Sequence, residues 1–589
     1  MRKMFRWLLP ILWVMVITVL AACGSNTPAP SEDGTTAPQT TVQSEDGTSS
    51  SSSVTTEPAT TAPQTTADPC ANGHSYNSID TPPTKLEQGY TTHTCSVCGD
   101  SYVDSYVPAT GSVGLAYKVN PDGETFTVTG IGTCKDTDLV IGEEMGGYTV
   151  TAIGSNAFAE NGSLTSITIP DTVTSIGDGA FSGCTGLTSI IIPDSVTSIG
   201  DRAFSGCTGL TSITIPDGVT SIGGEAFLGC SGLTSITIPD GVTGIGAFTF
   251  ASCTGIESIT IPDGVTSIGA AAFSGCTGLT SITIPDSVTS IGMRAFRYCF
   301  SLTIVKIPDS VTSIGKWAFD ECRGLTSITI PAGVTSIGEY AFNECNNITS
   351  ITIPNGVTSI DDCAFYGCGG LVSITIPDSV TRIGNEAFRY CKSLTNITIP
   401  SSVTSIGWQA FYGCSNLESI TIPDGVPTIG SHSFYQCSNL RSVTIPDSVT
   451  SIEYAAFYGC GELENVTIPA GVTSIGWHAF YDCNSLTSIT ILNGVPTISK
   501  LAFDGCRGLT SMVIPDSVTS IEELAFRGCA GLKSITIPKS VTSIGNGAFQ
   551  NCNSLKTVYY TGTADDWAKI STGNDNDILA SCNIVFVTP

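Results

Sequence analysis

Four residues near the start of the chain have the types and the spacing of zinc ligands. Cys70 and His74 are four residues apart, and Cys95 and Cys98 form a C-x-x-C pair about twenty residues further on. Thiolates and an imidazole nitrogen in two such pairs suit a tetrahedral Cys3His zinc site. Because protein side chains fill all four positions of that site, its metal is structural rather than catalytic. The sequence therefore predicts a structural zinc ion held by these four side chains.

These ligands define a small module over residues 68–110. Gly99 directly follows the C-x-x-C pair, where a zinc knuckle has a tight turn that aims backbone amides at the thiolates. The stretch resembles the zinc-ribbon-like elements that precede repeat domains in some bacterial surface proteins. Two alternatives stay open. Either His93 replaces His74 as a ligand, or the cysteines are free or oxidised and bind no metal.

The first 23 residues indicate a second kind of cysteine chemistry. They read MRKMFRWLLPILWVMVITVLAAC, which is a basic start, an apolar run and a short segment that ends at Cys23. Residues 1–22 are predicted to be a signal peptide, and the final LAAC resembles the bacterial lipobox. That resemblance implies cleavage before Cys23 and a diacylglycerol on its thiol, so we expect an extracytoplasmic protein, lipid-anchored to the bacterial cell membrane. The alternative is a plain membrane anchor.

Composition describes the stretch after the anchor and excludes some partners. Residues 23–67 are rich in Ser, Thr, Pro and acidic residues and nearly lack apolar ones, so we expect a disordered stalk. The whole chain of 589 residues has a formal net charge of −28. Because nucleic acids and anionic lipid surfaces attract basic patches, no nucleic-acid partner is expected, and the lipid anchor is the expected link to the membrane.

The larger part of the chain repeats itself. Seventeen cysteines from Cys184 to Cys552 recur every 23 residues without an insertion. A short fixed period is typical of a solenoid, in which each unit buries its apolar face only against its neighbours. Residues 151–552 are therefore predicted to form about eighteen stacked repeats.

One repeat unit shows which elements to expect in every coil. Ile213 and Ile215 alternate with polar residues, which is typical of a strand, and Pro216 follows where the strand must end. Phe227 and Cys230 are three residues apart, as on one face of a single helical turn. We therefore predict an α/β repeat solenoid of 23-residue units, with a parallel β-sheet and short helical turns.

The pattern CxxLxxIxIPxxVxxIGxxAFxxC resembles the BspA-type leucine-rich repeat, also called the Treponema type. The resemblance extends to the flanks, where residues 111–150 are similar to an N-terminal cap and residues 553–589 to a C-terminal cap. Thr563 followed by Asp566 can cap a helix that carries Trp567. The resemblance implies a surface or secreted binding protein with a role in adhesion, and no catalysis.

In-register repetition turns each repeat position into a column of side chains. Stacked cysteines point the same way, whereas a disulfide needs Cβ atoms directed at each other. We therefore predict buried free thiols that act as small apolar fillers. An aspartate follows the repeat prolines from Asp171 to Asp309. A straight column of single carboxylates does not converge on one point as calcium requires, so we expect these residues to cap turns.

The columns that flank each Ala-Phe pair vary most and hold the candidate ligand-binding residues. Early repeats have small residues there, whereas later repeats have large aromatic ones, which mark binding surfaces because rigid rings lose little entropy on association. The alternative is that each ring only packs on its neighbour in the next coil. The candidates are Trp317, Tyr340, Tyr366, Trp408, Tyr412, Tyr435, Tyr454, Tyr458, Trp477 and Tyr481.

The sequence contains no Ser–His–Asp, paired-carboxylate or phosphate-loop constellation. No catalytic residue is predicted, and we expect the protein not to be an enzyme. The favoured function is a lipid-anchored, adhesin-like surface protein whose solenoid binds an extracellular protein. Two alternatives stay open: a surface lipoprotein that binds a glycan through its aromatic stripe, and a passive envelope spacer.

Overall fold

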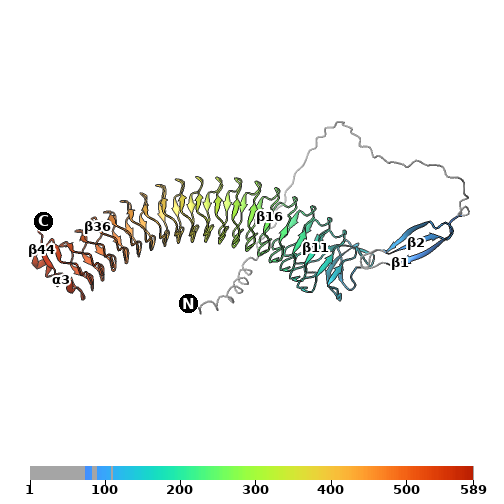
Figure 1. Cartoon of the computed structure of the whole chain (residues 1–589), viewed down its shortest axis with the longest axis horizontal. Helices are drawn as coiled ribbons and strands as arrows, with labels where there is room; N and C mark the ends of the chain where they lie inside the picture. The colour runs from blue at the N-terminus through green and yellow to red at the C-terminus, as the bar shows by residue number, and fades with distance from the viewer. Residues whose placement is uncertain (1–72, 83–88, 108–110, 588–589) are drawn as a thin grey trace, which may run out of the picture. The chain divides into compact units, whose positions relative to one another are not determined.

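The structure, a computed structural model, describes residues 73–82, 89–107 and 111–587 (Figure 1). The predicted signal peptide at 1–22, Cys23, the stalk at 23–67 and Cys70 lie outside the described residues. Within the described part of the chain, no helix is both long and apolar enough to span a membrane.

The first described residues form a small antiparallel sheet. Its strands are β1 (Tyr76–Thr81), β2 (Gly89–Cys95) and β3 (Ser101–Val107), paired in the order β1-β2-β3. Cys95 is the last residue of β2 and lies opposite Tyr76 of β1. The C-x-x-C pair therefore lies at the edge of the sheet where β1 begins and β2 ends.

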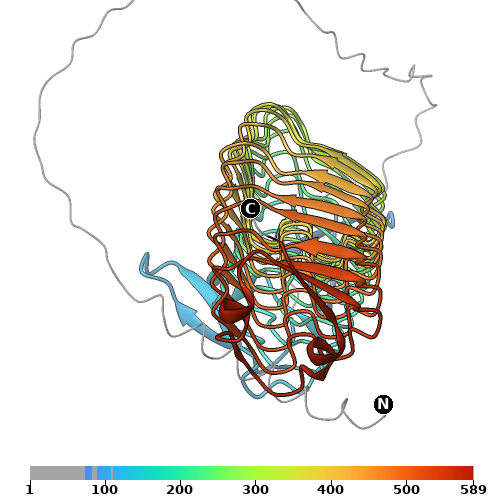
Figure 2. The same cartoon turned by 90° about the vertical axis from the view of Figure 1, so that its left-hand side faces the viewer.

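The rest of the described chain is a β-solenoid of about twenty turns with a repeat of about 23 residues. Most coils add one strand to each of two ladders, although the coil around Ile245 adds only an isolated bridge to the second. Figure 2 shows the coils one behind another. In β11 (Ser189–Ile191) and β13 (Ser212–Thr214), Ile190 lies beside Ile213. The isoleucines are buried while the flanking residues are exposed, as the period-2 alternation predicts.

The first ladder contains mostly three-residue strands, which pair in register within three successive sheets of five, eleven and four strands. They are β6 (Asp138–Val140), β9 (Ser166–Thr168), β11, β13, β15 (Ser235–Ile236), β16 (Ser258–Thr260), β18 (Ser281–Thr283), β20 (Ile304–Lys306), β22 (Ser327–Thr329), β24 (Ser350–Thr352), β26 (Ser373–Thr375), β28 (Asn396–Thr398), β30 (Ser419–Thr421), β32 (Ser442–Thr444), β34 (Asn465–Ile468), β36 (Ser488–Ile491), β38 (Ser511–Val513), β40 (Ser534–Ile537), β42 (Thr557–Tyr560) and β44 (Asn583–Phe586).

The second ladder begins with longer strands at its N-terminal end and continues as two-residue strands. They are β4 (Ala116–Val119), β5 (Thr125–Gly130), β7 (Glu144–Met145), β8 (Tyr148–Ile153), β10 (Ser175–Ile176), β12 (Ser198–Ile199), β14 (Ser221–Ile222), β17 (Ser267–Ile268), β19 (Ser290–Ile291), β21 (Ser313–Ile314), β23 (Ser336–Ile337), β25 (Ser359–Ile360), β27 (Arg382–Ile383), β29 (Ser405–Ile406), β31 (Thr428–Ile429), β33 (Ser451–Ile452), β35 (Ser474–Ile475), β37 (Thr497–Ile498), β39 (Ser520–Ile521), β41 (Ser543–Ile544) and β43 (Ser571–Thr572).

Two prolines account for interruptions of the second ladder. In most coils the threonine before the two-residue strand donates its backbone N–H to the carbonyl one coil earlier, as Thr404 does to Thr381 at 3.0 Å. Pro427 and Pro496 occupy that position in two coils and have no N–H to donate. The ladder accordingly divides between β29 and β31 and again between β35 and β37.

The predicted short helical turn around Ala-Phe is wrong. The backbone N–H of Phe204 donates to the carbonyl of Ala226 in the next coil at 2.8 Å, whereas the N–H of Cys207 donates back to Phe204 at 3.1 Å. Alternate amides therefore bond between coils, and the i→i−4 bonds of a helix cannot form. Arg202, with φ +56°, and Gly206, with φ +73°, adopt left-handed backbone that also breaks a helix. Among the described residues, the helices are only α2 (Ala564–Trp567) and α3 (Asp577–Ser581).

The core is a set of buried columns that run through the coils. The repeat phenylalanines from Phe158 to Phe549 are fully buried and stack face to face, with Phe181 and Phe204 5.3 Å apart between ring centroids. The caps continue both ladders, because β6 pairs with β9 and β44 with β42. The predicted capping box is present at α2, where Thr563 and Asp566 bond reciprocally.

Candidate functional site

Three of the four predicted metal ligands lie together at the end of β2. The ligand atoms of His74, Cys95 and Cys98 are all within 4.8 Å of one another. Nδ1 of His74 is 3.3 Å from Sγ of Cys98. Cys95 is buried, Cys98 is half-buried and His74 is exposed. The fourth predicted ligand, Cys70, lies outside the described residues.

The turn after β2 brings the two cysteines to the same point. The backbone N–H of Gly99 donates to the carbonyl of Cys95 at 3.0 Å, and Gly99 has φ +80°, which favours glycine. The backbone amides of Cys98 and Val97 donate to the Cys95 sulfur and lower the pKa of its thiol to about 5. The predicted turn with amides aimed at the thiolate is therefore present.

The structure brings His74, rather than His93, to the cysteines. His93 lies in the middle of β2, where Nδ1 is 2.7 Å from the hydroxyl of Ser78 and Nε2 is 2.7 Å from a carboxylate oxygen of Asp104. Both ring nitrogens of His93 thus have partners within the sheet. His93 helps to join the three strands instead of serving as a ligand.

Four of the candidate tyrosines form a stacked ladder one position after the core phenylalanine. Neighbouring rings of Tyr412, Tyr435, Tyr458 and Tyr481 lie 4.5–4.6 Å apart and nearly parallel. The guanidinium of Arg389 covers the free face of Tyr412 at 4.4 Å. These rings are half-buried and face one another, so the column packs within itself and presents mainly ring edges and hydroxyls.

Three other candidates are exposed and share one repeat position, two residues before the alanine. Trp408 and Tyr454 are each 45% exposed and Trp477 is 55% exposed. Tyr454 lies between two histidines, with ring centroids 5.0 Å from His432 and 5.5 Å from His478. Large aromatic rings that stay exposed to solvent on an ordered surface are typical of a binding site. We call Trp408, Tyr454 and Trp477 the exposed ring column.

Of the three remaining candidates, Trp317 and Tyr366 contact arginines and Tyr340 contacts Trp317. Trp317 and Tyr340 stack at 5.5 Å, and the guanidinium of Arg294 lies 5.0 Å over Trp317. Tyr366 has Arg389 at 5.6 Å from its ring. These arginines and the two histidines were not among the predicted site residues. Their signal was their place in the variable columns on either side of Ala-Phe.

One coil, which we call the cationic coil (residues 293–315), departs from its neighbour at outward positions between Met293 and Lys306, whereas residues 307–315 are identical to residues 284–292. Ile304 is 60% exposed, Met293 is 44% exposed and Phe300 is 40% exposed. The guanidinium of Arg323, in the following coil, lies 5.3 Å over Phe300. The positions Ala270, Ala271, Ser274, Gly275, Thr277, Ser281 and Thr283 are replaced by Met293, Arg294, Arg297, Tyr298, Phe300, Ile304 and Lys306.

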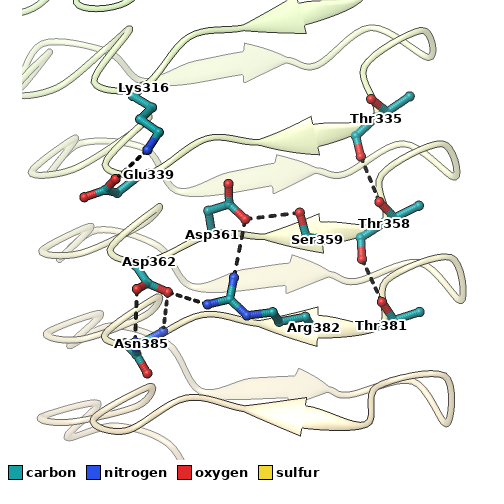
Figure 3. A network of polar contacts seen from close by, with 10 residues as sticks. All are labelled: Lys316, Thr335, Glu339, Thr358, Ser359, Asp361, Asp362, Thr381, Arg382 and Asn385. Carbon is teal, nitrogen blue, oxygen red and sulfur yellow. Dashed lines mark hydrogen bonds and ion pairs between the residues drawn. The ribbon is translucent and has the colours of Figure 1, made fainter.

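A polar network links coils that follow the cationic coil, between Lys316 and Asn385, along the second ladder (Figure 3). Arg382 stands where the neighbouring strand has Ser359, and its guanidinium contacts Asp362 at 2.9 Å and Asp361 at 3.6 Å. Asp362 also accepts the backbone N–H of Asn385 at 2.9 Å. Because these charges are paired with one another, the network joins coils and presents no separate ligand site.

The repeat cysteines are buried and form no disulfide with one another in the described coils, as predicted. They are more than apolar fillers, because each thiol lies 3.0–3.3 Å from the carbonyl oxygen of the phenylalanine in the preceding coil. Burial raises the pKa of Cys184 to about 11 and that of Cys299 to about 12. The column therefore lacks the thiolate that metal binding or nucleophilic chemistry requires.

The stacked parallel ladders and the in-register columns of Leu, Ile, Phe and Cys define a leucine-rich repeat solenoid. The model of the BspA type leucine rich repeat region matches residues 151–279, 266–395, 359–487 and 450–571. The chain therefore belongs to the BspA-type leucine-rich repeat family. That repeat family is a non-enzymatic scaffold type.

Solved bacterial structures are similar to this chain over most of its length. A leucine-rich repeat protein from Bacteroides ovatus is 28% identical, with 80% of this chain and 98% of that chain covered and a TM-score of 0.39. A leucine rich cell surface protein from Faecalibacterium prausnitzii is 27% identical, with the same coverage and a TM-score of 0.23. The leucine-rich repeat protein of T. pallidum is 20% identical over 52% of this chain and 88% of its own, with a TM-score of 0.18. No curated protein matches the chain.

Proposed function

We propose that this protein is an extracytoplasmic, lipid-anchored binding protein that recognises an extracellular protein through the exposed ring column. The observation that carries the proposal is the common exposure of Trp408, Tyr454 and Trp477 at one repeat position. Aromatic side chains of this kind dominate the energy of protein interfaces when a partner covers them. The lipid anchor at Cys23 is part of the same proposal and derives from the sequence alone.

The backing of the column supports this function. Tyr435 and Tyr458 stack at 4.5 Å, and each coil is bonded to the next by backbone amides. The exposed rings therefore stand on a surface that is already ordered. A pre-ordered surface loses little conformational entropy on binding, so more of the contact energy is available for affinity.

The cationic coil, which lies several coils before the exposed ring column, indicates the chemistry of a second contact with the partner. Lys306 and Ile304 are exposed next to each other on β20, and Arg294 lies over Trp317. Arg297 is paired with Asp320 at 2.7 Å, so Arg294 and Lys306 are the cations of this coil that remain for a partner, on a chain whose net charge is −28. We infer that the partner presents carboxylates beside apolar side chains, and that its binding weakens with added salt.

A direct test compares two triple variants of the chain without residues 1–23. The first variant replaces the exposed ring column, Trp408, Tyr454 and Trp477, by alanine. The matched control replaces three exposed strand residues, Thr398, Thr421 and Thr444, by alanine as well. Both are assayed against extracellular protein fractions and against a glycan array. The proposal expects a protein ligand whose binding falls at least tenfold in the first variant only.

Other results would replace the proposal by one of its alternatives. A glycan that binds the chain and is lost in the ring variant, without any protein ligand, would establish the glycan-binding function. Equal binding by both variants to every ligand would leave the column as packing and favour the spacer. The anchor is tested separately, because Cys23→Ser should move the protein from the membrane fraction to the soluble fraction.

A further inference from the structure

We propose that His74, Cys95 and Cys98 hold a structural zinc ion, and that this ion is what keeps the sheet of β1, β2 and β3 folded. The proposal concerns a part of the chain that the proposed binding function does not use. It begins from the geometry of the three side chains, whose ligand atoms lie within 4.8 Å of one another.

The distances suit a tetrahedral zinc site. Zinc–sulfur and zinc–nitrogen bonds of about 2.3 and 2.0 Å place neighbouring tetrahedral ligands roughly 3.5 Å apart. Nδ1 of His74 and Sγ of Cys98 are 3.3 Å apart. Sulfur and imidazole ligands select zinc over calcium or magnesium, which prefer oxygen.

Backbone bonds hold the ligands in place from both sides. The N–H and the hydroxyl of Ser96 both donate to the carbonyl of Ser75, at 2.9 and 3.1 Å. This tie fixes the residue after His74 against the residue after Cys95. The bond from Gly99 to Cys95 closes the turn that returns Cys98 to the same point.

The sheet has almost no apolar core of its own. Among its described side chains only Cys95 is buried, and all six residues of β1 are exposed. The ring of Tyr102 contacts Tyr76 and His93 at 5.1 and 4.7 Å, but Tyr102 is itself 46% exposed. A short three-stranded sheet without a core is not stable alone, and modules of this size fold when a metal supplies the missing free energy.

The proposal is tested by metal analysis of the full chain purified without chelators. We expect about one zinc per chain, and loss of that zinc in the double variant Cys95→Ser, Cys98→Ser. His432→Ala, a histidine substitution in the solenoid, is the matched control and should keep the zinc. Replacement by Co²⁺ should give thiolate-to-cobalt absorption, which His74→Ala should weaken or shift.

The folding claim has its own readout. Chelation should make the sheet at residues 73–107 sensitive to protease while the repeat coils stay resistant, and added zinc should restore protection. The proposal would be overturned if no stoichiometric zinc binds even after zinc is supplied. It would also be overturned if mass spectrometry of the native protein finds a Cys95–Cys98 disulfide, which lowers the mass by about 2 Da because two thiol hydrogens are lost. Binding by the exposed ring column should not change with zinc, so failure of one proposal is separate from failure of the other.

Discussion

The thiol of Cys207 lies 3.1 Å from the carbonyl oxygen of Phe181, a residue of the preceding coil. The same contact recurs at the other repeat cysteines, for example between Cys299 and Phe273 at 3.2 Å. The buried cysteine thiol thus donates to a backbone carbonyl oxygen in the core, where a carbonyl without a hydrogen-bond partner would lower the stability of the fold. This relationship explains why cysteine rather than alanine recurs at this position.

Replacing Cys299 separates the two roles of the column. Cys299→Ala removes the donor and leaves a small void, so we expect a loss of about 1–2 kcal/mol in stability. Cys299→Ser keeps a donor that can reach the carbonyl of Phe273 and should cost less. Hydrogen exchange of the flanking coils measures both. A larger loss for serine than for alanine would show that the thiol acts only as an apolar filler.

The raised pKa values predict inert thiols in the folded protein. Burial raises the pKa of Cys184 to about 11 and of Cys368 to about 12, so at pH 8 hardly any thiolate forms in the column. Iodoacetamide followed by mass spectrometry should leave the repeat cysteines unlabelled until the protein is unfolded in guanidinium. Rapid labelling of Cys368 under native conditions would contradict the buried column.

Two aromatic substitutions should differ in their effect on stability. Tyr435→Ala removes a ring stacked at 4.6 Å on Tyr412 and at 4.5 Å on Tyr458, and we expect a stability loss of about 1–3 kcal/mol. Trp477→Ala removes an exposed ring and should change stability by less than about 0.5 kcal/mol. Urea unfolding of both variants, with the wild-type chain alongside, measures the difference. Equal losses would mean that Trp477 also packs against its neighbours.

Histidines in the ring cluster predict a loss of stability in acid. Burial, followed by the charge of Arg389, lowers the pKa of His432, and burial lowers the pKa of His478. The unfolded chain therefore binds more protons than the folded chain just below the ordinary pKa of about 6.5. The contribution of these residues is present above that pH and is lost as the pH falls through it.

Proton titration by NMR, with histidine carbon labelling, measures the two pKa values directly. Both should lie below 6.5, and His432→Gln and His478→Gln assign the signals. The double variant should lose less stability than the wild-type chain between pH 7 and pH 5.5. A pKa of either histidine above the ordinary value would mean that the ring cluster stabilises the charged form.

Much of the fold can be predicted from the sequence because the apolar positions of the repeat are the positions that become buried. In each coil, Ile213 and its equivalents alternate with polar residues, and the fixed period of 23 leaves only in-register stacking as a way to bury them. The buried cysteines and the capping box at Thr563 were predicted for the same local reasons. The spacing of His74, Cys95 and Cys98 likewise named side chains that the structure brings together.

The tertiary structure decided what depends on the neighbouring coil. The spacing of Phe227 and Cys230 is helical, but amides around each Ala-Phe pair bond to the next coil, so no helix forms. Tyr458 and Trp477 are both aromatic and both near Ala-Phe, yet one is covered by stacked rings and the other is 55% exposed. The sequence determines which side chains each coil carries. Their exposure is set by atoms one coil away, which no local pattern contains.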